Sequence, residues 1–326
     1  MKIKEITLTN KNGMQLTLSN YGATILRLLV PTMSGELINV VVGLHKAEDY
    51  LQPDYENERL HLGNTIGRYA GRISNSGFTI NGEFYDLFND EGVHLHGGFS
   101  GFDKKYWDIV EIGEDEDPFV KMSCTSSHLE EGYPGNVQID ATFTLLESNA
   151  MRISYEAKTD QSTPINLTNH AYFNLSGTGS ILDHSLKLKC DSYLESHENL
   201  IPTGEILPVN NSHFDYRQSR VIGQKGFEPL DDCFVVSEAE NCAQLSSPKS
   251  KIVMTVSTNQ PSIVVYTHDR FPDWSFWQDS KYGDYPAICF EAQNYPDAPN
   301  QKHFPNSILE PGETYRNEVL FSFDLK

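Results

Sequence analysis

The sequence lacks the cysteine pattern of a disulfide-stabilised or thiolate-metal protein. Its five cysteines are odd in number and widely spaced, and no two of them form a Cys-x-x-Cys pair. A disulfide framework uses paired cysteines and a thiolate metal site uses closely spaced ones, so neither is expected. This cysteine usage is typical of a reducing compartment, and we expect the protein to be cytoplasmic.

Long apolar runs and an excess of positive charge are also missing. No run approaches the roughly 18 apolar residues of a membrane-spanning helix, so we expect no membrane association. The 45 acidic side chains outnumber the 25 basic ones, which gives a formal net charge of −20. Such a chain repels the phosphate backbone of a nucleic acid, whereas a neutral small molecule is not repelled.

Helical periodicity is nearly absent as well. Only residues 45–52 and 237–244 could form short helices, so the alternating strands and helices of a Rossmann or TIM fold are not expected. Residues 137–145 instead place apolar and polar side chains alternately on opposite faces, and residues 151–158 repeat the pattern after a turn. The two segments therefore predict a hairpin.

Turn residues support the same fold class. Asn-Gly pairs at residues 12–13 and 81–82 mark hairpin turns, because both residues of such a turn adopt positive φ. Many strands separated by such turns predict an all-β fold, a large antiparallel sandwich or barrel with very few short helices. The 38% hydrophobic content allows one large domain or two smaller ones. The longest irregular stretch, residues 267–285, could cover a site or be an ordinary surface loop.

Two polar side chains, His170 and Glu291, occur in segments that otherwise resemble buried strands. An imidazole can donate or accept a proton near neutral pH, and a carboxylate can accept one. If both side chains face one pocket, they form an acid/base couple. This couple is the central hypothesis that the sequence offers.

Arginine and aspartate pairs offer candidate ligand-binding side chains. Arg68 and Arg72 lie in a glycine-containing segment, and we expect one of them to reach a ligand. A guanidinium suits neighbouring hydroxyls or a carboxylate, although a surface ion pair is the commoner role. Asp231 and Asp232 point in opposite directions if extended, so at most one faces a pocket, and a solvated pair is the alternative.

His94 and His96 are spaced as in a strand, which would direct both rings to the same side. Two such rings could begin a metal site. A mononuclear site needs a third nitrogen or a carboxylate, and no acidic residue occurs in the four positions that follow His96. We therefore expect no metal.

Six motifs occur along the chain in a fixed order. They are Gly67-Arg-Tyr-Ala-Gly-Arg-Ile73, Leu95-His-Gly-Gly98 followed by Gly101-Phe-Asp103, Gly132-Tyr-Pro-Gly135, Asn166-Leu-Thr-Asn-His-Ala-Tyr-Phe-Asn-Leu175, Ile201-Pro-Thr-Gly204 and Phe290-Glu-Ala-Gln-Asn-Tyr-Pro-Asp-Ala298. In this order they resemble the signatures of aldose 1-epimerases, also called galactose mutarotases. The resemblance covers roughly residues 5–322. Any one motif would be weak evidence, whereas six in order are specific.

The resemblance implies a single large antiparallel β-sandwich domain over residues 1–326, with a sugar bound on the concave face of a curved sheet. Residue by residue, Glu291 falls on the general base and His170 on the general acid, converging across a gap that holds one pyranose. Arg72, His96 and Asp231 fall on sugar-binding positions. The implied substrates are free aldohexoses such as galactose and glucose, and no metal, nucleotide or redox cofactor is implied.

The implied reaction interconverts α and β anomers by opening the sugar ring. An ionised Glu291 would take the O1 proton while protonated His170 supplies one to the ring oxygen O5, and both would act in reverse after the aldehyde rotates. Three alternatives remain: a glycosidase that pairs Glu291 with a second acid such as Asp231, a non-catalytic carbohydrate-binding β-sandwich, and a hexose-phosphate epimerase with an added cationic cluster.

The chain also departs from the family pattern. Gly71 stands where many members have Asn, Asp232 where many have His, and Val264 where many have Gln. Loss of that glutamine removes a hydrogen-bonding group near the sugar, so the preferred sugar is not fixed by the sequence. Neither the aromatic side chain that covers the sugar nor the choice between a monomer and a homodimer is indicated.

Overall fold

The computed structural model describes residues 2–325, and three antiparallel sheets dominate it. The largest has nine strands, in the order β10 (Asp108–Gly113), β11 (Phe119–Ser126), β12 (Val137–Leu146), β13 (Ala150–Thr159), β27 (Tyr315–Leu325), β23 (Ile252–Thr258), β22 (Ala243–Ser246), β17 (Ser185–Leu188) and β20 (Arg220–Val221). A six-stranded sheet has the order β16 (Tyr172–Phe173), β25 (Ile288–Gln293), β24 (Ser262–Thr267), β21 (Asp231–Val235), β18 (Ser192–Ser196) and β19 (Pro202–Pro208). A four-stranded sheet consists of β1 (Glu5–Thr9), β2 (Gln15–Ser19), β3 (Thr24–Pro31) and β4 (Leu37–Asn39).

Short elements connect these sheets. The two-stranded pairings are β5 (Thr65–Ile66) with β15 (Thr168–Asn169), β6 (Arg72–Ile73) with β9 (His94–Leu95), β7 (Gly77–Ile80) with β8 (Glu83–Asp86), and β14 (Thr163–Pro164) with β26 (Ile308–Leu309). The helical segments are α1 (Pro53–Glu58) and the 3-10 turns η1 (Ala47–Leu51), η2 (Phe102–Lys104), η3 (Glu130–Gly132), η4 (Trp277–Asp279) and η5 (Ala298–Asn300). Within residues 2–325, no helix is long and apolar enough to cross a membrane.

The predicted hairpin is confirmed as β12 and β13, which pair from Val137 with Thr159 to Leu146 with Ala150. Along β12 the alternating apolar side chains of Val137, Ile139, Ala141, Phe143 and Leu145 are completely buried, and most of the polar ones between them are not. The turn at Asn81-Gly82 is confirmed too, since both residues have positive φ, +52° and +83°. At Asn12-Gly13 only the glycine has positive φ.

Of the two predicted short helices, one forms. Residues 45–52 contain η1, and α1 follows directly. Residues 237–244 are not helical, so that prediction is wrong. The end of this segment enters β22, which pairs with β17 on one side and β23 on the other, so sheet pairing overrides the weak helical preference.

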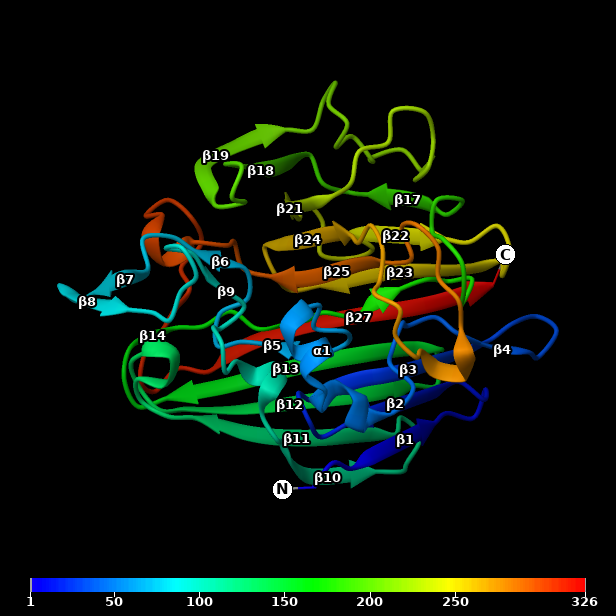
Figure 1. Cartoon of the computed structure of the whole chain (residues 1–326), viewed down its shortest axis with the longest axis horizontal. Helices are drawn as coiled ribbons and strands as arrows, with labels where there is room; N and C mark the ends of the chain where they lie inside the picture. Colours follow the sequence, from blue (N-terminus) through cyan, green and yellow to red (C-terminus); the bar gives the residue numbers. More distant parts are fainter. Residues whose placement is uncertain (1, 326) are drawn as a thin grey trace.

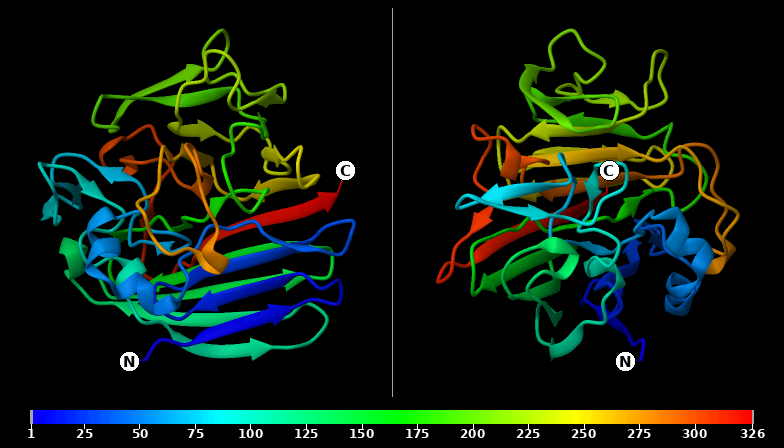
Figure 2. Two further views of the ribbon diagram at one scale, coloured as in Figure 1. Left: turned by 45° about the vertical axis from the view of Figure 1, so that its right-hand side comes forward. Right: turned by 60° about the vertical axis from the view of Figure 1, so that its left-hand side comes forward.

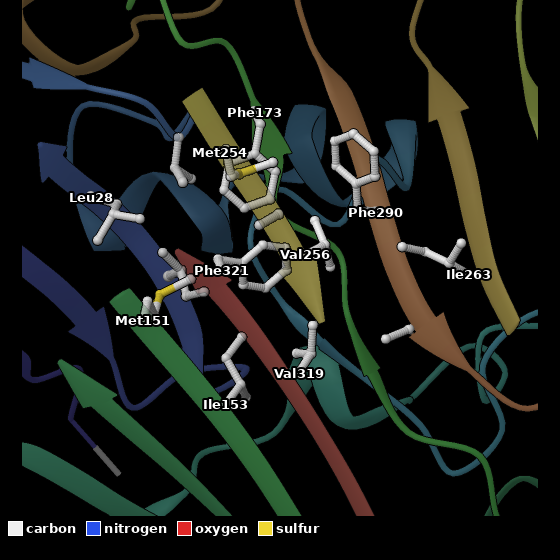
Figure 3. Packing of buried hydrophobic residues seen from close by; sticks show 14 of the residues in the cluster. Leu28, Met151, Ile153, Phe173, Met254, Val256, Ile263, Phe290, Val319 and Phe321 are labelled. Carbon is white, nitrogen blue, oxygen red and sulfur yellow. The ribbon is translucent and has the colours of Figure 1, made fainter. Parts of the chain in front are cut away.

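The sheets pack as a sandwich around one large apolar core. In Figure 1 the six-stranded sheet occupies the upper half and the four-stranded sheet the lower half, while the nine-stranded sheet extends through both. One cluster of buried side chains draws on all three sheets, including Leu16, Phe143 and Phe290. Figure 3 shows the contact of two layers, where Phe173 next to β25 lies against Phe321 of β27 with ring centroids 4.9 Å apart.

The six-stranded sheet has one apolar and one functional face. In β25, Ile288, Phe290 and Ala292 point into the core, because alternate side chains of a strand share a face. Cys289, Glu291 and Gln293 therefore point to the opposite side. Figure 2 shows that the β7–β8 hairpin and the loops on either side of it project from the body near this region.

Candidate active site

A cavity opens on the face of the six-stranded sheet that is turned away from the core. It has a volume of about 820 Å³ including its open mouth, and we call it the central cavity. Its polar lining includes all five of the side chains singled out from the sequence, namely Arg72, His96, His170, Asp231 and Glu291. These residues come from segments that are far apart in the sequence and meet only in the folded protein.

Glu291 and His170 are in contact. Nε2 of His170 lies 3.5 Å from Oε1 of Glu291, and both side chains are almost completely buried. The pairing of β16 with β25 sets Tyr172 opposite Cys289, which brings His170, two residues earlier, beside Glu291. Backbone hydrogen bonds between His170 and residues 63 and 64 fix this segment, and the imidazole stacks on Tyr172 with ring centroids 5.0 Å apart.

This contact corrects the expected gap between the two groups. A pyranose does not fit into 3.5 Å, so a sugar must lie against the pair and not between its members. The hemiacetal oxygens O1 and O5 are both bonded to C1, so an acid and a base that serve them must lie close together. The second carboxylate oxygen of Glu291, Oε2, has no hydrogen-bond partner among residues 2–325.

Burial changes the protonation of this pair. Desolvation, with a further contribution from Asp231, raises the pKa of Glu291 to about 8, and Arg72 opposes this rise only in part. Desolvation also lowers the pKa of His170 to about 3, helped by the nearby imidazole of His61. Between these pH values the pair holds one proton, which rests on Glu291. The expected form, an ionised Glu291 with a protonated His170, holds the same number of protons and differs by one transfer over the 3.5 Å contact.

Arg72 and Asp231 face each other in the central cavity. Nη2 of Arg72 lies 3.8 Å from Oδ2 of Asp231, and both side chains are partly exposed. Burial raises the pKa of Asp231, and Arg72 counteracts this shift. Asp232 accepts a hydrogen bond from the backbone N–H of Asp231 and is not part of the cavity lining. The prediction that at most one of the two aspartates faces a pocket is confirmed.

His96 enters the central cavity on a left-handed backbone, with φ of +53°. Its Nδ1 accepts a hydrogen bond of 3.2 Å from the backbone N–H of Gly71, so a neutral ring carries its proton on Nε2. Desolvation, with the neighbouring His61 and His170 rings, holds the pKa of His96 well below its usual value. His96 is therefore a neutral donor, suited to an oxygen of a ligand.

The prediction that His94 and His96 share one side is wrong. His94 is buried away from the central cavity, where its Nδ1–H donates to the carbonyl of Phe88 and its Nε2 accepts from the hydroxyl of Tyr133. β9 ends at Leu95, and the positive φ of His96 breaks the alternation on which the prediction relied.

A metal ion is a natural candidate for three of these side chains. The donor atoms of His96, His170 and Glu291 lie within 4.8 Å of one another. A histidine that binds a metal normally donates its other ring N–H to an acceptor. Nδ1 of His96 instead accepts from Gly71, which leaves the proton on the nitrogen that a metal would need. The hydrogen bonding of His96 therefore does not fit a metal site.

The two arginines of the glycine-containing segment lie in different surroundings. Arg72 reaches the central cavity, whereas Arg68 is buried and donates to three backbone carbonyls, to Ser126 and to Thr163. Gly71 and Val264, two of the departures from the family pattern, both line the cavity. Val264 lies directly between Cys233 and Glu291 across the sheet.

The structure adds side chains that the sequence reasoning missed. Gln293 lines the central cavity, and its Oε1 has no hydrogen-bond partner among the described residues. Its position two residues after Glu291 in one strand was a usable signal. His61 also lines the cavity, where its Nδ1 lies 3.1 Å from Asp103. Nothing in the spacing of His61 indicates this role, although Asp103 belongs to one of the six motifs.

Aromatic rings and the long irregular stretch complete the surroundings. Tyr172 and Tyr266 line the central cavity and meet edge to face, with ring centroids 6.1 Å apart. Residues 267–285 are largely irregular, as predicted, but do not line the cavity. One of them contacts a residue of the lining, since the ring of Phe271 packs on that of Tyr172 with ring centroids 5.6 Å apart.

Comparisons with known proteins agree with this geometry. The family model described as "Aldose 1-epimerase" matches residues 4–322. The galactose mutarotase of Rattus norvegicus is 37% identical over 94% of this chain and 90% of its own, and the aldose 1-epimerase of Haemophilus influenzae is 35% identical over 98% and 95%. A GalM/aldose epimerase homologue from C. elegans has a TM-score of 0.91 at 30% identity, covering 99% of both chains. A galactose 1-epimerase from Lactobacillus acidophilus has a TM-score of 0.86 at 30% identity, covering 100% of this chain and 95% of its own.

Proposed function

The chain belongs to the aldose 1-epimerase family and is an isomerase of aldose sugars, and we propose that Glu291 and His170 are its catalytic acid/base pair. The observation that carries this proposal is the 3.5 Å contact of the two side chains in one cavity. Each group, suitably placed, is worth roughly 10² to 10⁴ in rate. Two such groups are sufficient, because a hemiacetal ring already opens slowly in water.

The single proton of the pair moves through the reaction and is returned. Ionised Glu291 takes the proton of O1 while protonated His170 gives one to O5, so the C1–O5 bond breaks and an aldehyde forms at C1. The pair is then a protonated Glu291 and a neutral His170, the form that burial favours. After rotation about C1–C2, His170 takes the proton of the O5 hydroxyl and Glu291 gives one to the carbonyl oxygen as the ring closes on the other face.

The remaining side chains would hold the sugar while C1 turns. We assign Arg72 and Asp231 to neighbouring hydroxyls, since a guanidinium donates and a carboxylate accepts. His96 would donate from Nε2 to a sugar oxygen, as its contact with Gly71 requires. The rings of Tyr172 and Tyr266 are the candidates to cover the apolar side of the sugar. D-Galactose and D-glucose are the proposed substrates.

Two rival activities fit the central cavity less well. A phosphate would need a cluster of unpaired cations, yet the two arginines of the lining, Arg72 and Arg59, each lie 3.8 Å from an aspartate, Asp231 and Asp90 respectively. A glycosidase would use Asp231 as the partner of Glu291, yet Asp231 faces Arg72, and His170 is the group in contact with Glu291.

We propose that the chain acts as one domain, because the largest apolar cluster includes residues from Leu8 to Phe323. The reduced state of its buried cysteines is compatible with a cytoplasmic enzyme. We propose a monomer or a homodimer, and sedimentation would decide between them.

Polarimetry of freshly dissolved α-D-galactose and α-D-glucose tests the function directly. The enzyme should speed the approach to the equilibrium rotation, whereas a non-catalytic sugar-binding protein would leave it at the buffer rate. Arg72→Ala should chiefly raise KM, because it removes binding that the ground and transition states share. Arg316→Ala, on an exposed ion pair with Glu156, is the control for loss of an arginine. An unchanged KM in Arg72→Ala would remove Arg72 from the binding site.

A further inference from the structure

A second histidine–carboxylate pair lies beside the proposed catalytic pair. Nδ1 of His61 lies 3.1 Å from Oδ2 of Asp103, and the two side chains are only 10% and 8% exposed. His61 lines the central cavity, whereas Asp103 does not. The proposed acid/base steps use neither group, so the task of this buried pair is not yet explained.

The backbone fixes His61 relative to the catalytic histidine. The N–H of Asn64 donates to the carbonyl of His61, and the carbonyl of Asn64 accepts from the N–H of His170. The turn that carries His61 is therefore bonded directly to the segment that carries His170. The ring of His61 is held at its other side by Asp103, so its orientation in the cavity wall is defined.

Asp103 also determines which nitrogen of His61 carries the proton. An ionised carboxylate only accepts hydrogen bonds, so a neutral imidazole keeps its proton on Nδ1 and presents Nε2 as an acceptor. This Nε2 forms no hydrogen bond within residues 2–325, yet it is not sealed from solvent as the unpartnered Oε2 of Glu291 is. It is therefore available to a ligand in the cavity.

His96 offers the opposite hydrogen-bonding group next to it. The rings of His61 and His96 meet edge to face, with centroids 5.2 Å apart. Nδ1 of His96 accepts from the backbone of Gly71, so its Nε2 donates. A sugar hydroxyl both donates and accepts, so one hydroxyl can satisfy the two rings together.

The two rings lie on one side of the proposed catalytic pair. The centroids of His61 and His96 are 6.0 and 5.5 Å from that of His170. The facing arginine and aspartate of the cavity instead influence Glu291. Since Glu291 serves O1 and His170 serves O5, the two rings lie on the O5 side of the sugar.

We propose that His61, oriented by Asp103, binds the 6-hydroxyl of an aldohexose together with His96 and sets a preference for sugars that carry this hydroxyl. The inference rests on the proposed function, which places O5 against His170. O5 joins C1 to C5, and C5 carries the hydroxymethyl group. The hydroxyl that a group beside O5 and away from O1 meets is therefore the 6-hydroxyl, which would accept from His96 and donate to His61.

6-Deoxy-D-galactose tests the inference, because it differs from D-galactose only in lacking this hydroxyl. By polarimetry, the wild-type enzyme should have a kcat/KM at least about tenfold higher for galactose than for the deoxy sugar. His61→Phe keeps a ring but removes the acceptor, and it should lower this ratio about tenfold. The double variant His61→Phe with Asp103→Leu should lower the ratio equally, and it leaves no unpaired buried carboxylate to disturb folding.

His184→Phe is the matched control. His184 is also buried and lies 2.9 Å from an aspartate, Asp183, but neither residue lines the central cavity. This variant should leave the ratio of the two kcat/KM values unchanged, whatever its effect on thermal stability.

The outcomes separate this inference from the function on which it rests. If the wild-type enzyme accelerates the mutarotation of neither sugar, the proposed function fails and the inference fails with it. If both sugars are accelerated but the ratio is unchanged in the single and double variants of His61, only the assignment of the 6-hydroxyl is refuted. The contact of His61 with Asp103 would then serve the fold alone.

Discussion

Burial determines the chemistry of Glu291. A carboxyl in water ionises near pH 4.5, and desolvation in the central cavity raises the pKa to about 8. The same desolvation lowers the pKa of His170 to about 3, so burial favours the neutral form of both groups. The pair consequently retains one proton over the whole neutral range, which is the number that ring opening and closure require.

The pH dependence of kcat/KM should reflect this shared proton. Above about pH 8 Glu291 loses the proton while His170 is already neutral, so the pair has no acid and the rate should fall. Polarimetry with galactose from pH 5 to 10, corrected for the buffer rate, measures this limb. An alkaline limb near pH 6.5 would instead indicate a histidine with an ordinary pKa and would contradict the assignment.

Stability should improve when the carboxyl is removed. The folded pKa of Glu291, about 8, lies above its unfolded value of 4.5, so its contribution to stability is complete below pH 4.5 and is lost as the pH rises through 8. Glutamine does not titrate. Glu291→Gln should therefore raise the free energy of unfolding by on the order of 3 kcal/mol near pH 8 and by little at pH 4.5.

Thermal or urea unfolding at both pH values measures this difference. Glu114→Gln, at an exposed position, controls for the loss of one negative charge. An equal effect of Glu291→Gln at pH 4.5 and pH 8 would refute the raised pKa.

Gly63, in the turn before β5, holds the backbone segment that carries His170. Gly63, with φ of +73°, donates its N–H to the carbonyl of His170, and its own carbonyl accepts from the side chain of Asn169. A Cβ at this position would overlap the backbone of Ile25. Gly63→Ala should therefore lower stability by roughly 3 kcal/mol or more and lower kcat at least about tenfold.

Gly226→Ala is the matched control for this substitution. Gly226 also has positive φ, +84°, but a Cβ there would meet no atom within 4 Å. It should cost only about 1 kcal/mol, the strain of the backbone alone, and leave kcat unchanged. Similar losses in both variants, seen in urea unfolding and in polarimetry, would mean that close packing at Gly63 has no role in holding His170.

Period-two patterns predict the strands well and the cavity only in part. The β12–β13 hairpin follows from alternation in the sequence, and the Asn81-Gly82 turn follows from the preference of that pair for positive φ. Alternation fails where the backbone leaves the extended region, which is why His94 and His96 separate. The helix predicted at 237–244 fails for a different reason, because pairing with strands distant in the sequence decided its structure.

The sequence gives least information about the detailed geometry that arises where distant segments meet. Residue types single out Glu291 and His170, the resemblance to the family adds Arg72, His96 and Asp231, and the central cavity contains all five. The 3.5 Å contact, the tautomer of His96 and the presence of His61 and Gln293 depend on how the sheets close around the core. Side-chain protonation follows from that burial, so it could not be predicted without the fold.

The most direct test of the account is the initial rate of α-D-galactose mutarotation for Glu291→Gln, His170→Asn and the double variant, each checked for folding by circular dichroism. If the two side chains act as one pair, each single variant should lose at least about 100-fold of the enzymatic acceleration, and the double variant should lose little more. A single variant that keeps more than about a tenth of the wild-type acceleration would contradict the assignment of Glu291 and His170 as the catalytic pair.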